Sequence, residues 1–130
     1  MKDKLVEQDI GMVDDVLELC KNLVSIESHS FGSYVADGNE KWLELSQKAR
    51  EIRTKYLSMI TKKDNSQGWC ISKHIAECLM RIQEVYTRFL STNQKEQAKI
   101  CAIDYGNLYL LFMEINGYGG DENVSTKSSA

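Results

Sequence analysis

The chain has 130 residues, a formal net charge of −3 and a sequence pI of about 5.4, which argues against a general nucleic-acid binder because such proteins usually carry a basic excess. It contains no proline and 42% hydrophobic residues, as is typical of a mostly helical globular protein. No apolar run reaches the roughly eighteen residues of a membrane span, and residues 1–9 lack the apolar core of a signal peptide. We therefore expect a cytoplasmic protein that does not enter a membrane.

The first expected helix covers residues 10–28, after a polar segment, residues 1–9, that is predicted to be frayed. Its apolar residues follow the i, i+3, i+4, i+7 spacing of one helical face: Val13, Val16, Leu17, Cys20, Leu23 and Val24. Residues 29–38 are predicted to form a connection, because Gly32 and Gly38 interrupt the helical pattern. The apolar side chains Phe31, Tyr34 and Val35 predict that this connection packs onto the helices.

The second and third helices are expected over residues 39–63 and 69–91, with Asn39 as the N-cap of the second. Each has apolar residues at steps of three and four, which correspond to heptad positions a and d. In the second helix these residues are Trp42, Leu45, Ala49, Ile52, Tyr56 and Met59. In the third they are Ile71, Ile75, Cys78, Ile82, Val85 and Phe89.

The fourth helix is expected over residues 93–116, with Gly117 ending it in a left-handed conformation. Its link to the third helix is so short that the two could form one bent helix. Short connections between amphipathic helices favour antiparallel neighbours. The sequence therefore predicts an all-α fold, an antiparallel four-helix bundle, with one domain over residues 10–117 and a small, polar, disordered tail over residues 118–130.

Cysteine and histidine positions argue against a metal centre or a catalytic site. Cys20, Cys70, Cys78 and Cys101 all lie within apolar helical patterns, and we expect them to be reduced core residues. Cys70, His74 and Cys78 are spaced four residues apart, but the two cysteines would be about 12 Å apart along a helix, too far to share one ion. No partner is placed beside His74. We assign no metal, cofactor or catalytic residue, and a non-catalytic role is favoured over an enzymatic one.

Basic residues occupy heptad position g on the second and third helices: Lys41, Lys48, Lys55, Lys62, His74, Arg81 and Arg88. Glu44, Glu51, Glu77 and Glu84 each precede a basic residue by four positions, which favours weak intrahelical ion pairs on a solvated face. Alternatively, the basic rows bind nucleic acid. They would share a groove if these helices met through g, and would point apart if the helices met through position e, which includes Arg53, Ser72 and Leu79.

The same region admits a simpler explanation of its charge. Residues 38–63 contain seven basic and three acidic groups, and residues 1–30 contain three basic and seven acidic groups. The surplus of 7 − 3 = +4 could therefore neutralise the deficit of 3 − 7 = −4 on the first helix instead of meeting an anionic partner.

The fourth helix is apolar nearly all round. Between residues 100 and 115 its polar side chains are those of Asp104, Asn107 and Glu114, apart from the tyrosine hydroxyls. The excess apolar surface must be covered by the 29–38 connection, a second subunit or a ligand. We expect a homo-oligomer with an interface of residues Tyr105, Tyr109, Leu110 and Met113.

These features favour a non-catalytic module that self-associates through the fourth helix and acts as an assembly or adaptor subunit, with a protein partner in addition to its own copies. The first alternative is a nucleic-acid-facing subunit of a larger complex that uses the basic rows. The second is a small ligand- or metal-binding bundle centred on His74.

Overall fold

The computed structural model describes residues 10–62 and 66–118. This part of the chain is all-α and contains four helices: α2 (Ile10–Asp37), α3 (Glu40–Leu57), α4 (Ser66–Ser91) and α5 (Lys95–Ile115). The predicted fold class is confirmed. The predictions for residues 1–9 and 119–130 lie outside the described residues, whereas Tyr118, predicted to begin the disordered tail, is buried, and its N–H donates to the Met113 carbonyl at 2.7 Å.

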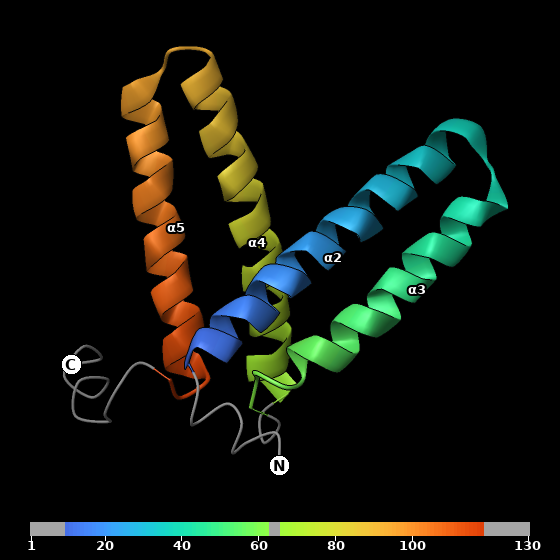
Figure 1. Cartoon of the computed structure of the whole chain (residues 1–130), viewed down its shortest axis with the longest axis horizontal. Coiled ribbons are helices and arrows are strands. Elements are labelled where there is room, and N and C mark those ends of the chain that lie inside the picture. The colour runs from blue at the N-terminus through green and yellow to red at the C-terminus, as the bar shows by residue number, and fades with distance from the viewer. Residues whose placement is uncertain (1–9, 63–65, 119–130) are drawn as a thin grey trace. The chain divides into compact units, whose positions relative to one another are not determined.

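The chain divides into two compact units, residues 1–60 and 61–130. In the first unit α2 packs against α3, and in the second α4 packs against α5. Within each pair the helices are antiparallel neighbours joined by a tight connection (Figure 1). Each pair thus has the helix contacts of a helical bundle, as the short predicted connections indicated.

The prediction that residues 29–38 form a connection is wrong, because α2 continues through residue 37. Of the two glycines, only Gly38 has a positive φ, of 71°, whereas Gly32 lies within the helix. A glycine inside a helix costs about 1 kcal/mol relative to alanine, which a long packed helix tolerates. Phe31 and Val35 are exposed and Tyr34 is half-buried, so the predicted packing of these three side chains is wrong for two of them.

Local capping determines the turn between α2 and α3. The Gly38 N–H donates to the Tyr34 carbonyl oxygen at 2.7 Å, and the Asn39 side chain accepts from the Lys41 N–H at 3.0 Å, which confirms Asn39 as the N-cap. The Asp37 carboxylate accepts from the Asn39 N–H at 2.9 Å and from the Trp42 indole N–H at 3.1 Å. These two hydrogen bonds, the backbone one first, lower the pKa of Asp37.

The predicted end of the second helix at residue 63 is wrong, because α3 ends at Leu57 and a turn follows. The Asn116 side chain, just beyond α5, stabilises the chain after this turn: its Oδ1 accepts from the Lys62 N–H at 3.0 Å. Its Nδ2 donates to the buried Ser72 hydroxyl on α4 at 2.8 Å and to the Phe112 carbonyl at 2.9 Å. One amide thus satisfies three polar groups of the second unit.

A turn at residues 92–94 separates α4 from α5, so the two are not one bent helix. Asn93 has a φ of 64°, and the Gln94 N–H reaches back to the Phe89 carbonyl at 2.8 Å. Asparagine is among the few residues other than glycine that adopt this left-handed conformation readily. At the other end of α5, Gly117 has a φ of 83°, which confirms the predicted helix stop.

The predicted a and d faces of the second and third helices are correct only in part: Ala49 and Ile75 are buried as predicted, whereas the other buried residues lie next to predicted positions. On α3 the buried residues are Ala49, Arg53 and Leu57, while Leu45 is exposed. On α4, Ser72, Ile75, Ala76 and Leu79 are buried. Ile71, Cys78 and Val85, three predicted seam residues, are exposed. The buried faces include arginine and serine, which a purely apolar pattern does not detect.

Candidate functional site

Four large apolar side chains of α5 are exposed. The exposed fractions are 52% for Ile100, 63% for Ile103, 62% for Leu110 and 41% for Leu111. At about 3.6 residues per turn, these residues share one face of the helix with the exposed Asn107. We call this set of five residues the α5 outer face.

The α5 outer face lies opposite the packed side of the helix. Ala98, Phe112 and Met113 are buried, and Tyr105 and Tyr109 are half-buried. Of the four interface residues predicted from the sequence, Leu110 therefore lies on the outer face, whereas the half-buried Tyr105 and Tyr109 lie on the packed side with the buried Met113. Ile100, Ile103 and Leu111 were missed as interface candidates, although they contributed to the apolar excess that drew attention to this helix.

All seven residues predicted to bind nucleic acid are exposed: Lys41, Lys48, Lys55, Lys62, His74, Arg81 and Arg88. Ion pairs join Lys48 to Glu51 at 3.9 Å and Arg81 to Glu84 at 2.8 Å. In both, the basic residue precedes the glutamate by three positions, the reverse of the predicted order. These contacts are those of a solvated face and contribute little stability.

An ion pair inside the first unit supports the explanation that basic residues of 38–63 neutralise acidic residues of the first helix. Arg53 on α3 donates from Nε and Nη2 to the two carboxylate oxygens of Glu27 on α2. The Arg53 side chain is 4% exposed and that of Glu27 20%. Part of the basic surplus of α3 therefore neutralises an acidic group of α2.

Two buried basic residues, Arg53 and Lys21, were not predicted as interior residues. Lys21 is almost fully buried and its Nζ lies 2.9 Å from Glu18 Oε2. The sequence offers one indication of such burial, a carboxylate within reach of the basic side chain, because a buried lysine or arginine needs a partner of opposite charge. For Lys21 that carboxylate lies three residues earlier on the same helix.

The cysteines have different environments, contrary to the expectation that all four are buried. All are free thiols; Cys20 is buried, Cys101 is half-buried, and Cys70 and Cys78 are exposed. Burial raises the pKa of the Cys20 thiol to about 12, against the opposing effect of the Arg53 charge. His74 is exposed, with Nδ1 at 3.7 Å from Glu77. Within residues 10–62 and 66–118, no three His, Cys, Asp or Glu side chains are grouped so that they could hold a metal ion.

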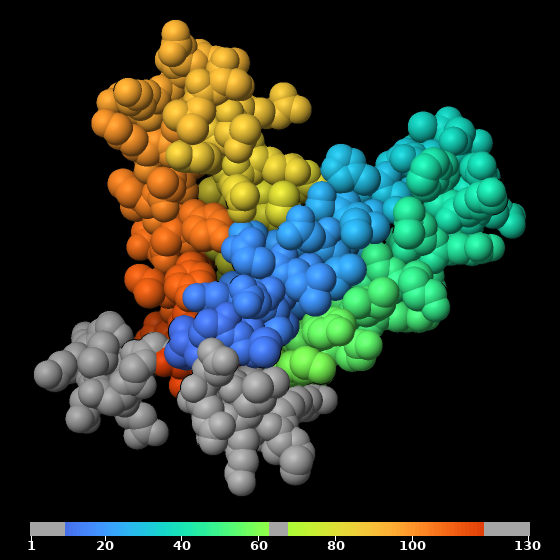
Figure 2. Space-filling model, in the orientation of Figure 1, coloured from blue at the N-terminus to red at the C-terminus, as the bar shows by residue number. Residues whose placement is uncertain are grey.

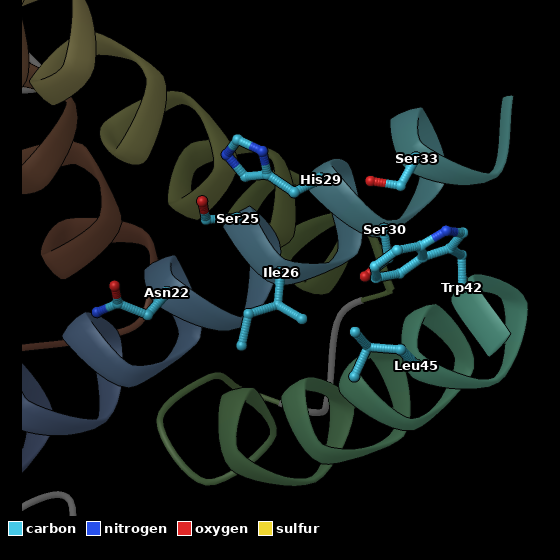
Figure 3. A pocket seen from close by; sticks show the side chains of 8 residues that line it. All are labelled: Asn22, Ser25, Ile26, His29, Ser30, Ser33, Trp42 and Leu45. Atoms are coloured by element: carbon cyan, nitrogen blue, oxygen red, sulfur yellow. The ribbon is translucent and has the colours of Figure 1, made fainter. Parts of the chain in front are cut away.

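A shallow hollow lies between α2 and α3. Its volume is about 360 Å³, and eight residues line it: Asn22, Ser25, Ile26, His29, Ser30, Ser33, Trp42 and Leu45. In Figure 3, Ile26 and Leu45 point toward one another and the Trp42 indole lies beside Ser30, while His29 points away. The hollow is thus a gap between two helices with both polar and apolar side chains in its walls, and the histidine among them points away from it.

In the space-filling view, the upper parts of α4 and α5 are seen beside each other (Figure 2). Among the described helices, none combines the length and apolar character that crossing a membrane requires. Comparison with family models, curated proteins and solved structures finds none that matches this chain.

Proposed function

We propose that the protein is a non-catalytic helical module that self-associates through the α5 outer face and acts as an assembly or adaptor subunit. One observation supports this above all: four large apolar side chains lie exposed on one face of a helix whose opposite face already packs within the chain. Contiguous exposed apolar surface of this kind typically marks an interaction site.

The energetics fit a modest affinity. Fully burying an Ile or Leu side chain contributes about 1.5–3 kcal/mol, so four side chains that are about half exposed contribute roughly 4 kcal/mol per copy. Two copies together gain roughly 8 kcal/mol, against an association cost of about 4–15 kcal/mol. Even at the low end of that cost, the net gain of about 4 kcal/mol corresponds to a Kd of about 1 mM, so we expect a weak, reversible dimer and not an obligate assembly.

Sedimentation velocity over a dilution series tests the proposal. The wild-type protein should change from monomer toward dimer as its concentration rises toward the millimolar range, and Leu110→Asp should remain monomeric. The matched control is Val35→Asp, which places the same charge at a similarly exposed apolar residue, 68% exposed, on α2. Monomeric wild-type protein throughout, or equal loss of association in both variants, would contradict the proposal.

Nucleic-acid binding ranks second. The observation in its favour is that the side chains of all seven basic-row residues are exposed. Against it, three of these residues have an ion-pair partner on their own helix: Lys48, His74 and Arg81. The Arg53 charge is also committed to Glu27. This role predicts that the protein binds nucleic acid weakly, in a salt-sensitive way and without recognising particular bases.

A further inference from the structure

The α5 outer face has the spacing of a coiled-coil seam. Ile100, Ile103, Asn107 and Leu110 follow one another at steps of three, four and three, which makes them heptad positions a, d, a and d. The seam is separate from the buried face of α5, which holds Ala98, Phe112 and Met113. A surface of this pattern fits a second helix of the same pattern.

Asn107 restricts how a second helix can be placed. It is the one polar residue of the seam, at position a between Ile103 and Leu110, and it is exposed. In a parallel, in-register pair, a faces a, so the two Asn107 amides can hydrogen-bond to each other. A single asparagine at position a fixes register and strand number in this way. In an antiparallel pair, a faces d, so Asn107 would lie against Ile103 of the other copy and leave a buried amide unsatisfied.

The charges beside the seam favour the same arrangement. Lys99 occupies position g and Asp104 position e, and both are exposed. In a parallel pair, g faces e of the following heptad, so Lys99 of each copy meets Asp104 of the other. The antiparallel register that aligns the seam residues instead places Asp104 opposite Asp104. Lys99 pairs with Glu96 at 3.4 Å in its own chain, and its ammonium has two further donors for this contact.

We infer that two copies associate through parallel, in-register α5 helices, with Asn107 facing Asn107 and two Lys99–Asp104 pairs across the seam. This inference rests on the proposed self-association and specifies its partner and geometry. The seam covers only eleven residues, about 16 Å of helix. A short seam suffices here because α5 is already folded against α4, so association does not have to order the helix.

Disulfide trapping tests the register. Asn107→Cys is placed in a chain carrying Cys70→Ser, Cys78→Ser and Cys101→Ser. Cys20 remains, because it is buried and its thiol is protonated. Mild oxidation with diamide should convert most of this variant to a covalent dimer. The matched control Ala102→Cys, at an exposed position of α5 away from the seam, should remain mostly uncrosslinked.

The outcomes separate this inference from the proposed function. Antiparallel copies would hold the two residues at position 107 about 6 Å apart along the axis in addition to the helix separation, too far for a disulfide. Equal crosslinking of the two variants, in a protein that still dimerises by sedimentation, would overturn the parallel arrangement and leave self-association standing. A wild-type protein that stays monomeric would overturn both.

A charge-reversal series tests the orientation without new cysteines. In the parallel pair, Lys99→Glu and Asp104→Lys should each raise the dimer Kd roughly tenfold, because two attractive pairs become repulsive. The double variant should return the Kd to within about threefold of the wild-type value, since it restores both pairs. In the antiparallel pair, Asp104→Lys replaces an Asp–Asp contact by a Lys–Lys contact, which is also repulsive, so the Kd should change little. Unchanged Kd values for the single variants would therefore contradict the inference.

Discussion

The Arg53 guanidinium on α3 and the Glu27 carboxylate on α2 form a bidentate ion pair, with Nη2 and Oε1 separated by 3.1 Å. The pair joins residues 26 positions apart in the sequence and fixes which face of α3 meets α2. Arg53 is nearly buried whereas Glu27 retains some contact with solvent. Buried pairs of this kind are costly to break singly, because the remaining charge has no partner.

Arg53→Ala should therefore lower the free energy of unfolding by about 2–4 kcal/mol, somewhat below the usual range for a fully buried pair because Glu27 is partly exposed. The double variant Arg53→Met with Glu27→Leu should recover most of this loss, since it removes both charges and keeps the volume. Urea denaturation followed by circular dichroism measures both. A single variant within about 0.5 kcal/mol of wild type would show that the pair is not structural.

The cysteines should differ in reactivity. At pH 8, a thiol reagent should modify Cys70 and Cys78 rapidly and Cys20 only after unfolding, because Cys20 is buried and its pKa is raised to about 12. Peptide mapping after timed labelling identifies each site. Rapid labelling of Cys20 in the folded protein would contradict its buried position.

The same shift of the Cys20 pKa predicts a pH effect on stability. The pKa rises from 9.0 in the unfolded chain to about 12 in the folded one, so the unfolded state loses its proton first. This contribution to stability is complete below pH 9 and is lost as the pH rises toward 12. Cys20→Ala should show a shallower loss of stability across that interval in urea titrations. An equal slope in both proteins would contradict the shift.

Asp37 should titrate below its ordinary pKa of 3.8, because the Asn39 N–H and the Trp42 indole stabilise its charged form. Its contribution to stability is present above pH 3.8 and is lost as the pH falls through the lowered folded pKa. The Trp42 indole N–H resonance should follow this titration, and Asp37→Ala should abolish it. A midpoint at or above 3.8 would argue against the two hydrogen bonds.

Replacing Lys48, Lys55, Arg81 and Arg88 together by glutamine tests the nucleic-acid role. The proposal predicts weak binding of the wild-type protein to single- or double-stranded probes, with an affinity that falls steeply as salt rises because phosphate contacts release counterions. The quadruple variant should lose this binding and keep its helical circular dichroism, since all four side chains are exposed. Absence of wild-type binding at low salt, or unchanged binding in the variant, would leave self-association as the better account.

Local signals predicted the helices better than their packing. Asn39 and Gly117 act as the caps that their positions indicated, because capping depends on a few neighbouring backbone groups. Gly32 resembled a break, yet no local rule distinguishes a glycine that a packed helix tolerates from one that ends it. The buried positions of Arg53 and Ser72 depend on Glu27 and Asn116, which lie far away in the sequence.

The candidate site was predicted only in part for a related reason. Composition showed that the fourth helix carries more apolar surface than one packing face needs. Composition did not show which side of the helix packs within the chain. Met113, which is buried, was therefore predicted in the interface, and the exposed Ile103 was left out. When a helix is apolar on nearly all sides, the element that it packs against determines which side is buried. For α5 that element is α4.

Isotope-filtered NOE spectroscopy on an equal mixture of methyl-labelled and unlabelled protein tests self-association through the α5 outer face most directly. Intermolecular NOEs should arise from the methyl groups of Ile100, Ile103 and Leu110, and Leu110→Asp should remove them. Intermolecular NOEs confined to exposed apolar residues of α4, such as Ile71, Val85 and Leu90, or none at millimolar protein concentration, would contradict the account.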